Sequence, residues 1–495
     1  MENVFLSSTL EQQIEREMEL WKIPGASFAI LAPEQSTLFH SVGIRDESEK
    51  KVDDETLFCV ASCSKAMTAA LFAILATKGL VDFDRPVKSY IPEFRLADPE
   101  ATEKTTLRDM LCHRTGLGGH DGIWPFDQDY KTFHERFRYL EPSAPYGTVA
   151  QYSNVIYGLT GYIAERITGK SWPTLMEEYF FKPLGMHRSS CEASLLAADQ
   201  NHAMPFQVLD GKLTQLPIWD VDTVAPAASV NTCAKDMALW IHFLLSKGVT
   251  AEGVRLISEE IFQDMISPQI IYDDGISKKT DKYHCDGYAL GWKSGIFHGH
   301  SIRLHTGKIE GYSTIQGFLP ELGIGGSIMV NLHSPVDGFT YGFLFTIFEM
   351  LLGIPEEDRT PWSELIHGPN MPTAETYLDC YFDILKDRYP ESRPMDAKDA
   401  CRLGIHKKLV GTYFHLGYGH LSIYEKEDQL RLKWRDQDLP LTPHWGNLLE
   451  VDGIKEDTMT MRLPVLPLYE EGASASSIQI PLEPMVADIS FKRIS

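Results

Sequence analysis

The spacing of apolar residues along the first eighty positions predicts a series of helices and strands. Helical spacing predicts a helix over residues 10–21. Residues 26–31 and 36–43 are predicted to be two strands joined by a short polar turn. The apolar run 66–79 then predicts a second helix, which ends at Gly79. A helix, an antiparallel pair of strands and another helix together indicate a mixed α+β layout.

The same kind of pattern continues to residue 352. Further helices are predicted near residues 106–117, 155–169 and 234–245. Strands are predicted over 288–293, 302–307, 312–319 and 324–331, and a closing helix over 343–352. The spacing of these strands is that of consecutive antiparallel neighbours in the sheet begun near residue 26. The aromatic-rich segment 121–146 is open to two interpretations, an insertion that faces a substrate or ordinary packing.

A change of composition separates the rest of the chain. Residues 354–400 carry several prolines among many charges and are interpreted as a connector. From residue 409, short alternating runs recur about every ten positions, which predicts a small antiparallel barrel or sandwich. A chain of 495 residues is expected to form two or three domains. The predicted domains are therefore 1–353, the connector 354–400, and a β-barrel domain over 401–495.

The net charge indicates which partners are expected, and the cysteines indicate which cellular compartment is expected. The formal net charge of −23 argues against nucleic acid or an anionic membrane as a partner, because both require basic surfaces. No window is long and apolar enough for a membrane span, and the first residues lack the pattern of a signal peptide. The eight cysteines are scattered and include no Cys-x-x-Cys pair, so neither a zinc site nor a disulfide framework is indicated. A cytoplasmic location is expected.

The first candidate for chemistry is Ser62, which leads the apolar run, together with Lys65 three residues later. Both side chains would lie on the same face at the start of a helix. A desolvated amine near the positive end of the helix dipole can lose its proton and act as a base for the serine hydroxyl. Taken alone, the Ser-x-x-Lys pattern is weak, since a second copy begins at Ser48 in an exposed charged run. The alternative for Ser62 is a helix N-cap.

Two further motifs lie where the predicted elements need them. Tyr152-Ser153-Asn154 precedes a helix, and His305-Thr306-Gly307 ends a strand. Each has an ordinary explanation, a capping Ser or Asn and a strand that runs into a glycine turn. A catalytic role is one interpretation of His113, and a cap of the helix C-terminus is the other and is favoured. His298, His300 and His305 with Asp286 are candidates for a metal site, but they show no familiar ligand spacing, so no metal ion is expected there. No cofactor is expected either.

The three motifs in this order resemble the penicillin-recognising serine hydrolases, above all the class C β-lactamase and D-alanyl-D-alanine carboxypeptidase branch. Other stretches that resemble this family are Trp21-Lys22-Ile23-Pro24-Gly25, Gly79-Leu80-Val81-Asp82, Leu107 to Leu117, Pro183-Leu184-Gly185-Met186 and Gly291-Trp292. The resemblance covers about residues 10–352. It implies an antiparallel sheet flanked by helices plus an all-helical subdomain. Residues 409–495 are similar to the lipocalin-like barrel of some family members.

The resemblance also implies roles for the first two motifs. Ser62 would be the nucleophile that is acylated, and Lys65 would share or relay its proton. Tyr152 would act as general base and then as general acid. Asn154 would orient Lys65 and a substrate amide.

The third motif would line the site from the edge of the sheet. His305, Thr306 and Gly307 are implied to bind substrate, and the backbone N–H groups of Ser62 and Lys308 would form the oxyanion hole. The penicillin-binding enzymes usually carry lysine at the position of His305. Histidine is common there in esterase, peptidase and acyltransferase relatives, and it weakens the grip on a substrate carboxylate at neutral pH. Efficient hydrolysis of β-lactams is therefore not expected.

The expected function is a serine hydrolase that cleaves an ester, amide or peptide bond of a small-molecule or peptide substrate through an acyl-Ser62 intermediate. An alternative is a transesterase, acyltransferase or cyclase of secondary metabolism that uses the same acyl-enzyme. A catalytically silent binding module would be expected to have lost Ser62, Lys65 or Tyr152, and all three are present. The barrel could cap the site, mediate a homo-oligomer or stabilise the chain.

Overall fold

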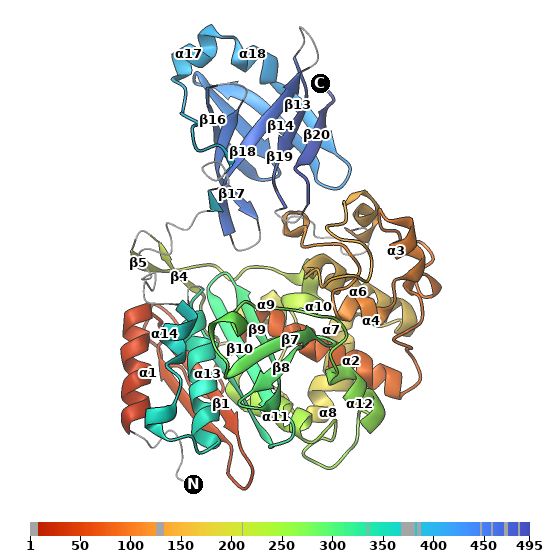
Figure 1. Ribbon diagram of the computed structural model, residues 1–495, viewed down its shortest axis with the longest axis vertical. Helices are drawn as coiled ribbons and strands as arrows, with labels where there is room; N and C mark the ends of the chain where they lie inside the picture. Colours follow the sequence, from red (N-terminus) through yellow and green to blue (C-terminus); the bar gives the residue numbers. More distant parts are fainter. Residues whose placement is uncertain are drawn as a thin grey trace. The chain divides into compact units, whose positions relative to one another are not determined.

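The computed structural model describes residues 8–124, 133–209, 211–333, 336–367, 382–383, 388–445, 448–456, 459–469, 474–483 and 486–495. The chain forms two compact units (Figure 1). The first comprises Met1–Glu93, Glu103–Gly116 and Pro145–Leu378. The second comprises Phe94–Thr102, Leu117–Ala144 and Asp379–Ser495.

The first unit is built on an antiparallel sheet, whose seven strands within the described residues have the order β2-β1-β11-β10-β9-β8-β7. The strands are β1 (Gly25–Leu31), β2 (Leu38–Gly43), β7 (Tyr283–Tyr288), β8 (Lys293–Phe297), β9 (His300–Ile309), β10 (Tyr312–Leu319) and β11 (Ile324–Val330). In β1, β10 and β11 every residue is buried, because helices cover both faces of the sheet. The N-terminal β1 pairs with β11, with Ala26 opposite Val330. The predicted α+β class with an antiparallel sheet is confirmed.

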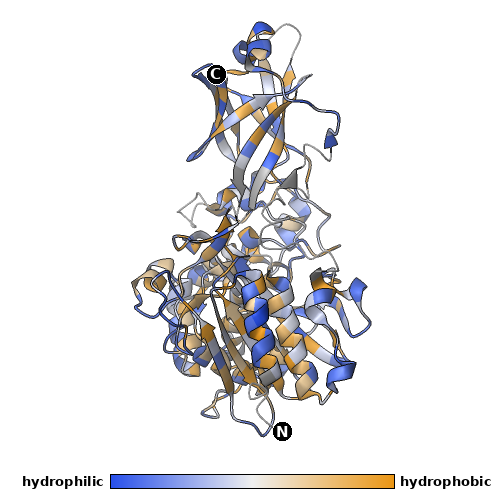
Figure 2. Ribbon diagram, turned by 90° about the vertical axis from the view of Figure 1, so that its left-hand side faces the viewer, coloured by the Kyte–Doolittle hydropathy of each residue, from blue (hydrophilic) through white to orange (hydrophobic). Residues whose placement is uncertain are grey.

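One face of the sheet is covered by α1 (Ser8–Trp21), α13 (Asp337–Leu351) and α14 (Trp362–His367). The apolar residues at helical spacing in α1 enter this core, and Phe28 of β1 packs against Phe339 and Phe343. In Figure 2 the strands of this unit are mostly orange, while the helices that cover them also carry blue. The helix α14 lies in the predicted connector, yet its Trp362 ring packs 4.9 Å from the Phe345 ring.

The other face carries the helices that surround the candidate site. They include α2 (Ser64–Thr77), α4 (Leu107–Leu111), α6 (Asn154–Thr168), α7 (Trp172–Leu175), α8 (Lys182–Leu184), α9 (Ala193–Ala198), α10 (Ala225–Ala228), α11 (Ala234–Leu245) and α12 (Glu259–Ile266). Residues 64–75 of α2 are all buried, so this helix is enclosed on every side. Its composition of alanine with Leu, Ile, Phe and Met suits that position, since no face of it meets water.

The predicted strand 288–293 is wrong, because a turn occupies this stretch. β7 ends at Tyr288 and β8 begins at Lys293. Gly291, in the turn, has φ +75, and an added Cβ would lie 2.6 Å from the carbonyl oxygen of Lys65. The turn therefore packs directly on the start of α2, and only glycine provides both the backbone conformation and the room.

The second unit contains a closed antiparallel barrel, which confirms the predicted C-terminal barrel. Its eight strands are β13 (Gly411–His415), β14 (Gly419–Lys426), β15 (Gln429–Trp434), β16 (Gln437–Pro443), β17 (Leu449–Glu456), β18 (Met459–Tyr469), β19 (Ala475–Ile480) and β20 (Ile489–Arg493). The pairing of β18 with β19 closes the ring. Two short helices, α17 (Ala397–Arg402) and α18 (Ile405–Leu409), precede it.

The described part of segment 117–144 packs on the barrel. His120 Nδ1 lies 2.8 Å from the Tyr418 hydroxyl, and the backbone N–H of His120 donates to Glu483 at 2.5 Å. The guanidinium of Arg435 donates to the carbonyl oxygen of Gly122. Within the aromatic-rich segment 121–146, Gly122 thus contacts the barrel, while both interpretations of the segment stay predictions; 125–132 lie outside the described part. Among the helices that the structure describes, none has the length and apolar character needed to cross a bilayer.

Candidate active site

The site is built around a single 3₁₀ turn, η2 (Ala61–Cys63), which leads directly into α2. Val60 N–H donates to Val230 O at 2.9 Å, and Ser64 Oγ accepts from Val230 N–H at 3.0 Å, so two bonds fix the turn. Ala61 has φ 45, a left-handed conformation that is costly for a residue with a Cβ. Ser62 lies inside this turn and caps no helix, so the N-cap alternative is wrong.

Lys65 is completely buried beside Ser62. Its Nζ lies 3.0 Å from Ser62 Oγ, 2.7 Å from Asn154 Oδ1 and 3.0 Å from the carbonyl oxygen of Ala227. The two carbonyl-type oxygens accept two N–H bonds of the amine. The position toward Ser62 can therefore hold either a third N–H or the lone pair of the neutral amine. Lys65 can thus exchange a proton with Ser62 without losing its other two contacts.

Tyr152, Ser153 and Asn154 lie at the start of α6. Ser153 is the N-cap, and its side chain accepts from the Ile156 N–H. Lys65 Nζ lies 4.7 Å from the centroid of the Tyr152 ring. The predicted Ser62, Lys65, Tyr152 and Asn154 are thus brought together from the turn η2, the start of α2, the loop before α6 and the first residue of α6.

The third motif lies on β9, which runs against η2. A Cβ on Gly307 would collide with the carbonyl oxygen of Val60 and lie 3.1 Å from Cys63 N, so only glycine allows this approach. Cys63 is also bound from the sheet. Its Sγ donates to the carbonyl oxygen of His305 at 3.4 Å, and its carbonyl oxygen accepts from Gln316 Nε2 at 3.0 Å. The strand therefore holds the turn that carries Ser62.

His305 is buried and neutral. Its Nδ1 lies 2.6 Å from the carbonyl oxygen of Thr306, which can only accept, so Nδ1 carries the proton. Its Nε2 then accepts from the Tyr288 hydroxyl at 2.8 Å. Burial, with the charges of Lys65 and Lys293 nearby, lowers the pKa of His305 well below its ordinary value. His305 therefore supplies no positive charge at neutral pH.

Thr306 and Lys308, which follow His305 on β9, contribute differently to the site. Thr306 is half-buried on β9. The Lys308 side chain forms an ion pair with Asp337, at the start of α13, so its charge is already neutralised. Only the backbone of Lys308 is then available as the predicted donor.

Several contacts of the site were not apparent from the sequence. Tyr157 donates its hydroxyl to the Lys65 carbonyl at 2.9 Å, and Ala227 and Gln316 bind Lys65 and Cys63. No motif marks these residues, because each partner is far away in the chain. His113 also lies in the site: the helix C-cap is Cys112, and the His113 ring packs 4.4 Å from the Tyr152 ring. Its interpretation as a helix cap is wrong.

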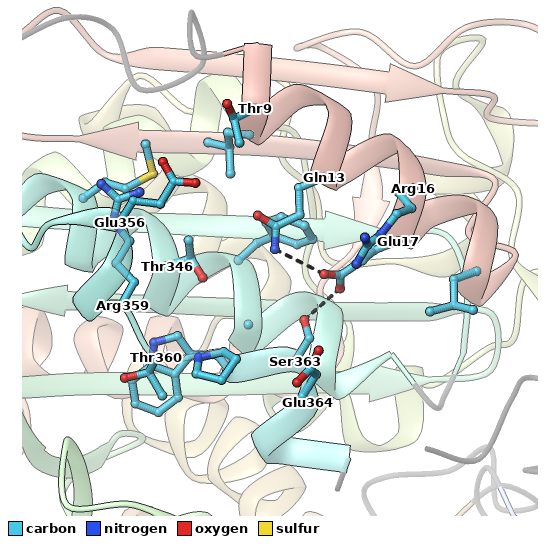
Figure 3. Close-up of a pocket in the computed structure, with 17 residues that line it drawn as sticks. Thr9, Gln13, Arg16, Glu17, Thr346, Glu356, Arg359, Thr360, Ser363 and Glu364 are labelled. Carbon is cyan, nitrogen blue, oxygen red and sulfur yellow. Dashed lines mark hydrogen bonds between the residues drawn. The ribbon is translucent and has the colours of Figure 1, made fainter. Parts of the chain in front are cut away.

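Another cavity lies on the opposite, α13-covered face of the sheet (Figure 3). It has a volume of about 310 Å³ and is lined by α1, α13 and α14. Figure 3 shows Glu17 held by Gln13 and Ser363, with Ser363 Oγ at 2.7 Å. None of its lining residues is a histidine, lysine, cysteine or tyrosine, and its one serine hydroxyl, that of Ser363, donates to the carboxylate of Glu17.

Two of the three histidines that were weighed as metal ligands, His298 and His305, have other partners. His298 Nε2 lies 2.7 Å from the buried carboxylate of Glu349, and both ring nitrogens of His305 are occupied. Within the described ranges, no group of three or more His, Cys, Asp or Glu side chains is arranged to hold a metal ion.

Sequence and structure comparisons find relatives over most of the chain. The Beta-lactamase family model matches residues 10–344. Unguisins hydrolase ungD of Aspergillus violaceofuscus is 26% identical over 444 residues, which cover 84% of this chain and 76% of that protein. Penicillin-binding protein 4 of Amycolatopsis lactamdurans is 24% identical and covers 67% of this chain and 85% of its own. The structure of the octameric penicillin-binding protein homologue from Pyrococcus abyssi superposes with a TM-score of 0.59 at 19% identity, covering 98% of this chain and 99% of that one.

Proposed function

Because the chain belongs to the beta-lactamase family, we propose that it is a serine hydrolase that forms an acyl-enzyme on Ser62. The observation that supports this most strongly is the buried Lys65, whose Nζ lies 3.0 Å from Ser62 Oγ and is held by two other oxygens. A buried amine with these contacts is positioned to accept and return a proton, as an activated serine requires.

In the proposed acylation, Ser62 Oγ attacks the substrate carbonyl carbon. Tyr152 is the general base, and Lys65 relays the proton that leaves Ser62. The backbone N–H groups of Ser62 and Lys308 stabilise the tetrahedral oxyanion. When the C–O or C–N bond breaks, Tyr152 returns the proton to the leaving alcohol or amine. Water then attacks the acyl-Ser62 ester by the reverse sequence.

We propose that the substrate is an ester, amide or peptide without a carboxylate at the part that contacts His305. The neutral imidazole and the ion pair of Lys308 with Asp337 support this, because neither side chain offers an unpaired positive charge. The similarity to a protein named as a hydrolase of unguisins supports hydrolysis as the reaction. Asn154, which accepts from Lys65 through Oδ1, can present its amide N–H₂ as a donor to a substrate carbonyl.

Labelling with a fluorophosphonate probe tests this proposal. The probe phosphonylates an activated serine, so peptide mapping by mass spectrometry should place the adduct on Ser62 and find none in Ser62→Ala. Ser48→Ala is the matched control, because Ser48 belongs to the other Ser-x-x-Lys sequence and is exposed, with Asp46 as its partner. An adduct on a different serine would contradict the assignment.

Transfer of the acyl group to an alcohol or amine uses the same intermediate. Product analysis in the presence of added amine separates transfer from hydrolysis. The cytoplasmic location and homo-oligomerisation stay predictions, and light scattering of the purified protein measures the second directly.

A further inference from the structure

His113 has no part in the proton transfers described above, yet it packs directly on the proposed base. Its ring centroid lies 4.4 Å from that of Tyr152, 4.9 Å from that of Tyr288 and 5.3 Å from that of Tyr157. The side chain is 1% exposed. The imidazole therefore forms the inner wall against which the Tyr152 ring rests.

His113 also binds the backbone on both sides of Tyr152. Its carbonyl oxygen accepts from the Gln151 N–H at 2.7 Å. Its Nδ1 accepts from the Ser153 N–H at 3.2 Å. One residue thus fixes the peptide groups before and after Tyr152, while its ring fixes the side chain between them.

The protonation state of His113 follows from these contacts. Because Nδ1 accepts from a backbone N–H, the proton of the neutral ring lies on Nε2. Nε2 is buried and has no hydrogen-bond partner within the described residues. Burial first, and then the positive charge of nearby Lys65, lowers the pKa of His113 well below its ordinary value. The ring is therefore neutral at working pH and adds no charge next to Lys65.

The backbone of His113 limits which residues can occupy this position. Its φ is 63, a left-handed conformation in which histidine, asparagine and aspartate are enriched. The position requires a residue that tolerates this conformation, presents an acceptor two bonds from Cβ and has a flat ring. A buried donor without a partner costs folding free energy, and such costs concentrate at functional sites.

We propose that His113 is a positioning residue that sets the orientation of Tyr152 toward Ser62 and Lys65. The proposal rests on the proposed function, since it concerns the base of that reaction. Three contacts of His113 in and next to the Tyr152-Ser153-Asn154 loop support this role. The carbonyl oxygen holds the Gln151 N–H, Nδ1 holds the Ser153 N–H, and the ring face supports Tyr152.

Two variants separate the contribution of the ring from that of the acceptor. His113→Asn keeps the left-handed conformation and an acceptor for the Ser153 N–H but removes the ring. His113→Phe keeps a ring against Tyr152 but removes the acceptor. Stopped-flow measurements with p-nitrophenyl acetate give the acylation rate constant from the burst. The dependence of that rate on substrate concentration gives the concentration at half-maximal rate.

We expect the acylation rate constant of His113→Phe to fall by about 100-fold, since a displacement near 1 Å at a reacting group has an effect of that size. The substrate concentration at half-maximal rate should change by less than about twofold, because the buried His113 side chain packs against Tyr152 and is proposed to act through it. The acylation rate constant of His113→Asn should be about tenfold higher than that of His113→Phe, because asparagine keeps an acceptor for the Ser153 N–H.

A core variant controls for general destabilisation. Phe345→Leu weakens packing on the α13-covered face, away from Ser62, and should lower the thermal midpoint while leaving the acylation rate unchanged. The proposal is overturned if both His113 variants acylate as fast as wild type, or if Phe345→Leu slows acylation as much as His113→Phe at equal loss of stability. Failure of the proposed function would show differently, as the absence of a burst in the wild-type protein.

Discussion

The Nζ atom of Lys65 lies 2.7 Å from the Oδ1 atom of Asn154, and this contact joins the helix that follows Ser62 to the first residue of α6. The pair is separated by 89 positions in the chain. Because Lys65 is completely buried, its orientation toward Ser62 depends on such partners and not on solvent. This hydrogen bond therefore links the position of Lys65, beside Ser62, to the loop that carries Tyr152.

Replacing the buried amine should remove most of the reactivity of Ser62. Lys65→Met keeps the length of the side chain but has no proton to exchange, so the acylation rate should fall by about 100- to 10,000-fold. Stopped-flow kinetics with p-nitrophenyl acetate measure it. Lys51→Met is the matched control, since Lys51 is the exposed lysine of the other Ser-x-x-Lys sequence. Comparable bursts from both variants would show that Lys65 is not needed.

The contact between β9 and η2 should tolerate no side chain at Gly307. A methyl group there would collide with the Val60 carbonyl and force the turn that carries Ser62 to move. Gly307→Ala should lower the free energy of unfolding by about 2 kcal/mol and slow acylation. Urea unfolding and burst kinetics measure the two effects.

A glycine on the surface provides the comparison for Gly307. At Gly253, with φ +83 and nothing near its added Cβ, alanine should cost only about 1 kcal/mol of backbone strain and leave acylation intact. Equal effects of the two substitutions would contradict a steric role for Gly307.

Stability should fall at mildly acidic pH because buried histidines are held neutral. His333 donates Nδ1–H to the Ile309 carbonyl at 2.9 Å, and burial lowers its pKa from 6.5 to about 4. The unfolded chain binds a proton below pH 6.5 whereas the folded chain does not, so stability is present above 6.5 and is lost as pH falls toward 4. The loss from one such group reaches at most about 3 kcal/mol.

Urea unfolding at pH 7 and pH 5 measures this loss. His113 and His305 should add to it, since the pKa of each is lowered in the same direction. His333→Asn should flatten the pH dependence compared with wild type. A wild-type stability that is unchanged between pH 7 and pH 5 would mean that these rings are not held neutral.

Glu17 should act in the opposite direction. Burial raises the pKa of its carboxyl above 4.5, and the hydrogen bonds from Ser363 and Gln13 only partly offset this. As pH rises above 4.5, the unfolded carboxyl ionises before the folded one, so Glu17 costs stability toward neutral pH. Glu17→Gln, which keeps the hydrogen-bonding shape, should raise the thermal midpoint at pH 7.5 more than at pH 4.5. Glu364→Gln, beside the same cavity, serves as the comparison.

The sequence motifs located the central residues because each motif is local. Ser62 and Lys65 lie within one turn, and Tyr152 and Asn154 lie within one loop, so helix starts and spacing were enough to predict them. The residues that hold these motifs in place were missed. Ala227 accepts from Lys65 across 162 positions and Gln316 binds Cys63 across 253 positions, and a backbone carbonyl or a lone glutamine carries no local signal.

The same limit applies to the fold. The strand 312–319, for example, was predicted at its observed bounds. β16 (Gln437–Pro443) was missed because it contains two prolines, which disfavour strands. β19 (Ala475–Ile480) was missed because it is rich in small polar residues. In both cases, pairing with neighbours in the closed barrel outweighs the local preference.

The most direct test is stopped-flow hydrolysis of p-nitrophenyl acetate by the wild-type protein and by Ser62→Ala. We predict that the wild type releases one equivalent of p-nitrophenol per active site in a burst before the steady state, and that Ser62→Ala shows no burst. Equal time courses for the two proteins would contradict an acyl-enzyme on Ser62.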